Sequence, residues 1–109
     1  MTNSKNVKLV VFVPTAHADA VREALGKAGA GKIGNYDFCS FSSRGLGRFF
    51  GNERSHPVIG QAGKLETVEE ERIEVVLPRA ILTKVIAKIK SVHPYEEVVF
   101  DVYPLEDIA

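Results

Sequence analysis

The sequence contains no tryptophan, one methionine and one cysteine among its 109 residues. The single cysteine, Cys39, cannot form an internal disulfide, so the core and the hydrogen bonds must hold the fold. The apolar run at residues 9–13 is shorter than the roughly 7–15 residues of a signal sequence or the roughly 20 residues of a spanning helix. These absences favour a cytoplasmic protein with no membrane partner.

An excess of charge of either sign is also missing, because 14 lysines and arginines balance 14 aspartates and glutamates. A general nucleic-acid binder carries a basic surface, so we expect no nucleic-acid partner. Hydrophobic residues make up 45% of the chain and charged residues 26%, as in ordinary globular proteins. The length predicts a single domain over residues 1–109.

The chain matches itself at an offset of 64 residues. KLVVFVPTA at residues 8–16 aligns with RIEVVLPRA at residues 72–80, and the aligned pairs include three identities: Val11/Val75, Pro14/Pro78 and Ala16/Ala80. The residue classes continue to agree beyond these segments. Each half of the chain therefore contains the same supersecondary unit.

Each unit is predicted to be a strand, a helix and a second strand. The first unit has a strand at residues 7–13, which Pro14 ends, and a helix that Thr15 can cap. Apolar residues follow at helical spacing: Val21, Ala24, Leu25 and Ala28 in the first unit, and Leu82, Val85, Ile86 and Ile89 in the second.

Second strands are expected near residues 36–42 and 98–103, and residues 44–64 form a hairpin strand and a long loop. Two right-handed units in one sheet predict an α+β fold, the ferredoxin-like β-α-β-β-α-β sandwich.

Residues 26–36, GKAGAGKIGNY, contain the spacing of two phosphate-binding motifs, the dinucleotide fingerprint and the P-loop. Both motifs need their glycines at the start of a helix, whereas these glycines close one. We therefore predict structural roles: Gly29 or Gly31 as the helix C-cap and Gly34 in a turn or bulge.

Both faces of the predicted sheet contain apolar residues, although two helices can cover only one face. Phe38 and Phe41 are predicted to point to opposite faces, as are Phe100 and Tyr103. A second apolar face on a small chain must be buried against another subunit. The sequence therefore predicts a homo-oligomer held by sheet faces.

The densest group of reactive residues is VHPYEE at residues 92–97. His93 with Glu96 or Glu97 could bind a divalent ion. Alternatively, His93 and Pro94 simply end the helix, Tyr95 packs, and the glutamates are solvated. Cys39, which we place in a strand, is either a metal ligand or a small buried residue, and His17 is expected to be exposed at the start of a helix.

Residues 42–57, SSRGLGRFFGNERSHP, hold three arginines among glycines and phenylalanines. This segment could bind an anion or a nucleic-acid strand, or form a hairpin whose phenylalanines join the oligomer interface. The acidic run at residues 69–71 is expected to be solvated surface.

Several segments resemble the YqfO-type domain, which occurs alone or inserted in proteins of the NGG-interacting-factor-three family: GKIGNYDFCSF, RGLGRF, HPVIGQAGKLETVEEERIEVVLP and HPYEEVVFDVYPL. The HPYE turn, His93 to Glu96, and the glycine-lysine strand entry also resemble CutA divalent-cation tolerance proteins. Both groups are similar to PII-like signalling proteins. The resemblance implies a homotrimer with inward-facing sheets and a link to divalent metal, copper or zinc, for which the candidate ligands are His93, Glu97, Cys39 and His17.

The larger domain that carries a two-metal centre in that family has no counterpart in these residues, and no complete set of base, nucleophile and oxyanion donor is evident. We therefore expect a trimeric, non-enzymatic protein linked to divalent metal binding or tolerance. The alternative is a PII-like regulatory sensor that binds a small molecule or nucleotide at clefts between subunits, with residues 44–64 as a mobile loop.

Overall fold

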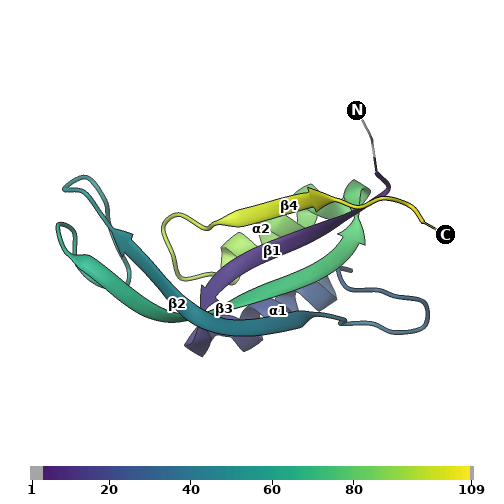
Figure 1. The fold of residues 1–109 in the computed structure, drawn as a ribbon, viewed down its shortest axis with the longest axis horizontal. Helices are drawn as coiled ribbons and strands as arrows, with labels where there is room; N and C mark the ends of the chain where they lie inside the picture. The colour runs from purple at the N-terminus through teal and green to yellow at the C-terminus, as the bar shows by residue number, and fades with distance from the viewer. Residues whose placement is uncertain (1–3, 109) are drawn as a thin grey trace.

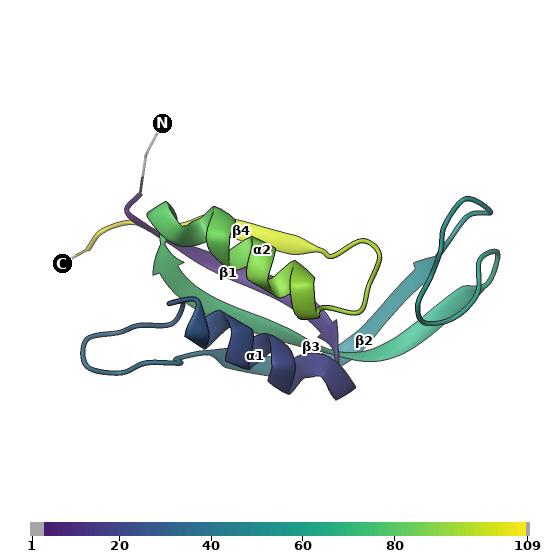
Figure 2. The ribbon, with the colours of Figure 1, turned by 180° about the vertical axis from the view of Figure 1, so that it is seen from behind.

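The computed structural model describes residues 4–108 and consists of one sheet with two helices on one of its faces (Figures 1 and 2). The strands are β1 (Asn6–Pro14), β2 (Phe41–Phe50), β3 (Leu65–Pro78) and β4 (Phe100–Pro104), and the helices are α1 (Ala18–Lys27) and α2 (Leu82–Val92). The strand order is β2-β3-β1-β4 and every neighbouring pair is antiparallel. The predicted ferredoxin-like α+β sandwich is confirmed. Neither helix is long and apolar enough to cross a membrane within the described residues.

The internal repeat covers the first strand and the helix of each unit. Pro14 and Pro78 end β1 and β3, a 3₁₀ turn follows at Thr15–His17 and at Arg79–Ile81, and each α-helix begins directly afterwards. The predicted cap at Thr15 is wrong, because His17 precedes α1 and provides no side-chain capping bond. The tight turn replaces the cap, since the backbone N–H of Ala18 bonds to the Thr15 carbonyl.

The core lies between the sheet and the helices. The residues larger than alanine that are at most 4% exposed there are Val7, Leu9, Val11, Val13, Ile73, Val75 and Leu77 from the central strands, Val21 and Leu25 from α1, and Val85 and Ile89 from α2. Burying each such aliphatic side chain contributes about 1.5–3 kcal/mol. The predicted apolar faces of both helices are therefore the faces that meet the sheet.

The glycines after α1 terminate the helix, as predicted. Gly29 has φ +99°, and its N–H bonds to the Gly26 carbonyl at 3.1 Å. The N–H of Ala30 reaches back to the Leu25 carbonyl at 3.0 Å, which completes a Schellman motif. Gly34, with φ +56°, lies in the following turn. These glycines follow the C-terminal end of α1, the negative end of the helix dipole, so they cannot hold a phosphate as a helix N-terminus does.

The predicted strand at residues 36–42 is wrong over most of its length, because β2 begins only at Phe41. Phe38 adopts φ 59°, which no strand residue has, and its ring lies against Gly26, where an added methyl group would meet it at 1.9 Å. Cys39 is consequently outside any strand and donates its backbone N–H to the Gly31 carbonyl at 2.9 Å. In the second half of the chain, β4 begins at Phe100.

Strands β2 and β3 continue past the end of β1 as a two-stranded arm (Figure 1). Pairing of β3 with β1 stops at Glu70 opposite Pro14, whereas its pairing with β2 continues to Leu65 opposite Phe50. We call residues 46–69 the arm, and it includes the loop 51–64 that connects the strands. Leu46, Phe50 and Leu65 are more than half exposed on it, because neither helix extends that far.

The sheet face opposite the helices is less apolar than predicted. Lys8 and Arg72 each lie 3.4 Å from the Glu74 carboxylate at its centre, and the Arg72 guanidinium lies 5.7 Å from the centre of the Phe12 ring. Large apolar residues do occur towards its edges: Phe41 and Tyr103. We call this surface the open face.

Candidate functional site

The turn after α2 is organised by His93, which is only 8% exposed. Its Nε2 lies 2.7 Å from the Phe12 carbonyl oxygen, and its Nδ1 accepts the backbone N–H of Tyr95 at 3.1 Å. These partners place the proton on Nε2 and use both ring nitrogens. Burial lowers the pKa of His93, and the Phe12 carbonyl and the Glu70 charge only partly oppose that effect. His93 is therefore a neutral residue that joins the turn to the end of β1.

Tyr95 extends this connection to the arm. Its hydroxyl donates a hydrogen bond to the Glu70 carboxylate at 2.5 Å. Burial raises the pKa of Tyr95, and the bond to Glu70 raises it further, so the phenol stays protonated. The Phe49 ring of β2 packs edge-on against Tyr95 with ring centres 5.9 Å apart. The turn is thus fixed against Phe49 in the arm and against Glu70, the β3 residue that adjoins the arm.

Glu70 lies on the open face of β3 and is 9% exposed. Space for its carboxylate exists because Gly47 of β2 has no side chain: a methyl group there would lie 2.0 Å from the Glu70 Oε1 atom. Within the described residues Glu70 forms no ion pair, and its only hydrogen-bond donor is the Tyr95 hydroxyl. A buried carboxylate with one neutral donor keeps an uncompensated charge.

A hollow of about 490 Å³ opens between the turn after α2 and the arm, where the loop 51–64 of the arm forms part of its wall. Its apolar lining residues are Phe12, Phe49, Phe50, Pro57, Val58, Ile59, Tyr95 and Val99, and its charged lining residues are Arg48, Glu70, Glu96 and Glu97. Glu96 accepts the backbone N–H of His56 at 2.7 Å and so ties the loop to the turn. The volume and the mainly apolar lining are typical of small-molecule sites.

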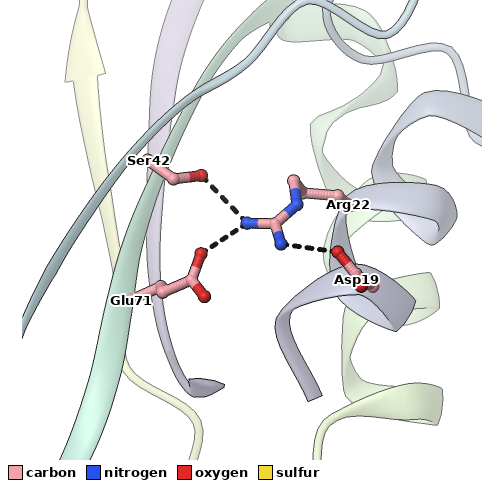
Figure 3. A network of polar contacts seen from close by, with 4 residues as sticks. All are labelled: Asp19, Arg22, Ser42 and Glu71. Carbon is pink, nitrogen blue, oxygen red and sulfur yellow. Dashed lines mark hydrogen bonds and ion pairs between the residues drawn. The ribbon is translucent and has the colours of Figure 1, made fainter. Parts of the chain in front are cut away.

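A second polar cluster lies on the helix side of the sheet (Figure 3). Arg22 of α1 lies 2.6 Å from Glu71, 3.0 Å from the Ser42 hydroxyl and 2.7 Å from Asp19. Glu71 is 6% exposed. Since these contacts join α1 to β2 and β3, the cluster stabilises the fold.

The acidic run at residues 69–71 is therefore only partly solvated, which corrects the prediction. Glu70 and Glu71 are buried on opposite faces of β3, because neighbouring strand residues alternate between faces. Sequence reasoning missed Glu70 and Gly47 as site residues. The alternation of side chains along β3 indicates that Glu70 and Glu71 point to opposite faces. The position of Glu70 beside Gly47 depends on the β2–β3 register, which the sequence does not show.

The four predicted metal ligands do not form one cluster within the described residues of this chain. Both ring nitrogens of His93 are already hydrogen-bonded to the backbone. Glu97 is exposed in the turn beside the hollow. His17 is exposed before α1, near enough to influence the His93 pKa. Cys39 lies beside Gly31, at the other end of the sheet, with its Sγ 3.9 Å from the Asp37 carbonyl. Residues 4–108 contain no cluster of three or more metal-type ligands.

The fold has the architecture of CutA proteins. The periplasmic divalent cation tolerance protein CutA from Archaeoglobus fulgidus superimposes with a TM-score of 0.69 at 16% identity, over 94% of this chain and 85% of that one. CutA1 from Pyrococcus horikoshii gives a TM-score of 0.69 at 15% identity, over 94% and 86%. Identities this low establish a common fold only.

Sequence comparison gives a more specific relationship. The chain is 52% identical over 104 residues to the GTP cyclohydrolase 1 type 2 homolog of Halalkalibacterium halodurans, covering 95% of this chain and 28% of that protein. The Bacillus subtilis homolog is 52% identical over 100 residues, covering 91% and 26%. A Bacillus cereus protein related to NIF3 superimposes with a TM-score of 0.79 at 50% identity, over 98% and 27%.

The chain therefore corresponds to one segment of these proteins and spans about a quarter of the length of the curated relatives it matches. No family model matches it. The predicted resemblance to a segment of proteins related to NIF3 is confirmed, and so is the likeness to the CutA fold.

Proposed function

We propose that this chain is a self-associating, non-enzymatic binding module of the CutA type, acting in the cytoplasm. The observation that supports it is the apolar surface that one subunit leaves uncovered: Phe41 is 67% exposed on the open face, and Phe50 and Leu65 are 61% and 65% exposed on the arm. Burying one such side chain contributes about 1.5–3 kcal/mol. Burial requires a closed oligomer, and the resemblance to CutA and PII-like proteins makes a homotrimer the proposed form.

Substitution on the open face tests this proposal. Phe41 lies opposite Glu74, so Phe41→Glu would bring a second carboxylate to a buried interface. A glutamate at Tyr103 would be less informative, because it would lie near the Arg72 guanidinium. Phe41→Glu should therefore reduce the sedimentation coefficient to that of a smaller species.

The matched control is Thr83→Glu, which makes the same change in charge at an exposed position of α2. This variant should sediment like the unmodified protein. If Phe41→Glu remains fully assembled while circular dichroism shows it folded, the open face is not the interface.

We also propose that the chain has no GTP cyclohydrolase activity of its own, although its relatives are named as homologs of such an enzyme. It spans about a quarter of their length, and the polar groups of His93 and Tyr95 are committed to structural hydrogen bonds. Incubation with GTP should release no formate. Formate release that follows the protein through gel filtration would contradict the proposal.

The link to divalent metal is part of the same proposal and requires ligands from more than one subunit, because His17, Glu97 and Cys39 do not meet within one. Calorimetry with zinc and copper should show binding that depends on assembly. His17→Ala and Glu97→Gln should each weaken it. Unchanged affinity in both of these variants and in Cys39→Ser would contradict a metal site of this composition.

A second candidate function, a regulatory sensor, is favoured by the hollow of about 490 Å³. The hollow lies within one subunit, so a ligand does not need the cleft between subunits that the sequence suggested. A ligand that binds the folded state raises its melting temperature. A thermal-shift screen of small metabolites and nucleotides tests this candidate, and a screen without any stabilising compound would count against it.

A further inference from the structure

The hollow between the turn after α2 and the arm is lined by aromatic side chains and carries an excess of negative charge. Its lining includes the carboxylates of Glu70, Glu96 and Glu97 but only one cationic side chain, Arg48. The charged lining thus carries three carboxylates against one guanidinium.

The three carboxylates differ in how far their charge is compensated. Glu96 lies 3.6 Å from the ring of His56 and also accepts a backbone bond from that residue. Glu97 is exposed and forms no hydrogen bond or ion pair within the described residues. Glu70 is buried and has only the Tyr95 hydroxyl as a donor. Two negative charges at the hollow thus have no cationic partner in the described part of the chain.

Aromatic rings lie next to these charges. Phe49 and Tyr95 are in edge-on contact, and the Tyr95 hydroxyl reaches Glu70. Phe12 and Phe50 also line the hollow. An ammonium group is attracted both to a carboxylate and to the face of an aromatic ring, and the attraction is stronger where water is excluded.

We propose that this hollow binds a small organic cation, a primary or quaternary amine with an aromatic or aliphatic body. Its charged head lies against Glu70 and Glu97, and its apolar body packs between Phe49, Phe50 and the loop 51–64. The inference rests on the sensor function proposed above.

The test uses 2-phenylethylammonium as the probe, and 2-phenylethanol and phenylacetate as neutral and anionic compounds of the same shape. Binding to the full chain is measured by titration with NMR detection of the Phe49 and Tyr95 signals. The cation should bind at least tenfold more tightly than either control. Glu70→Gln should lower its affinity about tenfold.

Glu69→Gln is the matched control, because Glu69 is exposed and lies opposite Leu46 on the other face of the arm. That variant should bind the cation like the unmodified protein. Since Glu70→Gln could disturb the turn, Glu97→Gln provides a second variant at an exposed position, and it should also weaken binding.

Equal affinity for the cation and the neutral compound would overturn the proposal, as would unchanged cation affinity in both Glu70→Gln and Glu97→Gln. A sample that mixes isotope-labelled and unlabelled chains shows by NMR which contacts come from a neighbouring subunit. Such contacts inside the hollow, found without the probe, would also overturn the proposal. Failure to bind any of the three compounds, with a different ligand class found by the thermal screen, would refute the cation proposal and leave the sensor function standing.

Discussion

The Arg22 cluster allows a quantitative test of how the helix layer is held to the sheet (Figure 3). Arg22→Met keeps most of the apolar stem but removes the guanidinium from Glu71, whose side chain is 8% exposed. Breaking a buried pair by removing one partner costs about 3–5 kcal/mol. The Arg22 side chain is 29% exposed, so water screens part of this cost. We expect a loss of about 2–3 kcal/mol.

The assay is urea unfolding followed by circular dichroism at one fixed protein concentration, because the stability of an oligomer depends on concentration. For a chain of this size the loss corresponds to a fall of about 8–12 °C in melting temperature. The matched control is Lys27→Met, which removes an exposed ion pair with Glu23 on the same helix. That change should cost only about 0.3–0.5 kcal/mol.

A double variant, Arg22→Met with Glu71→Leu, also removes the carboxylate that Arg22→Met leaves unpaired. It should recover part of the lost unfolding free energy. A loss below about 0.5 kcal/mol in Arg22→Met, equal to that of Lys27→Met, would refute the reasoning. Exact additivity of the double variant would refute it too, because the two residues would then not be coupled.

Two further predictions concern the ends of the helices. Gly29→Ala places a side chain at φ +99° and should lower the free energy of unfolding in urea by about 1–2 kcal/mol. Gly45→Ala, which has open space around it, should lower it by less. Equal losses in the two variants would contradict the Schellman assignment. Burial lowers the pKa of His93, so the unfolded chain binds the proton more tightly and stability should fall as the pH drops below about 6.5. His93→Gln should flatten that dependence, and an unchanged slope between pH 7.5 and 5 would contradict the role assigned to His93.

The sequence allowed the architecture to be predicted because its signals are local. The repeated strand and helix segments, the prolines that end β1 and β3, and the glycine that ends α1 each act over a few residues. The prediction of a strand at residues 36–42 was wrong. Apolar residues alternate there as in a strand, but Phe38 has a left-handed conformation and packs against Gly26. That packing depends on tertiary structure.

The candidate site was only partly predictable for the same reason. HPYEE was identified as the strongest cluster, and His93 does sit at the end of α2. Its partners come from elsewhere in the chain: the Phe12 carbonyl from β1 and Glu70 from β3. Glu70 was treated as surface because an acidic run looks solvated, whereas Gly47 opens a space that buries its carboxylate.

The central claim is that a CutA-type subunit with uncovered apolar surface must assemble. Sedimentation equilibrium of the unmodified protein at micromolar concentration tests it most directly. The account predicts a single species with three subunits of 11.9 kDa each. A stable monomer at that concentration would contradict both the proposed burial of the open face and the trimer that the resemblance implies.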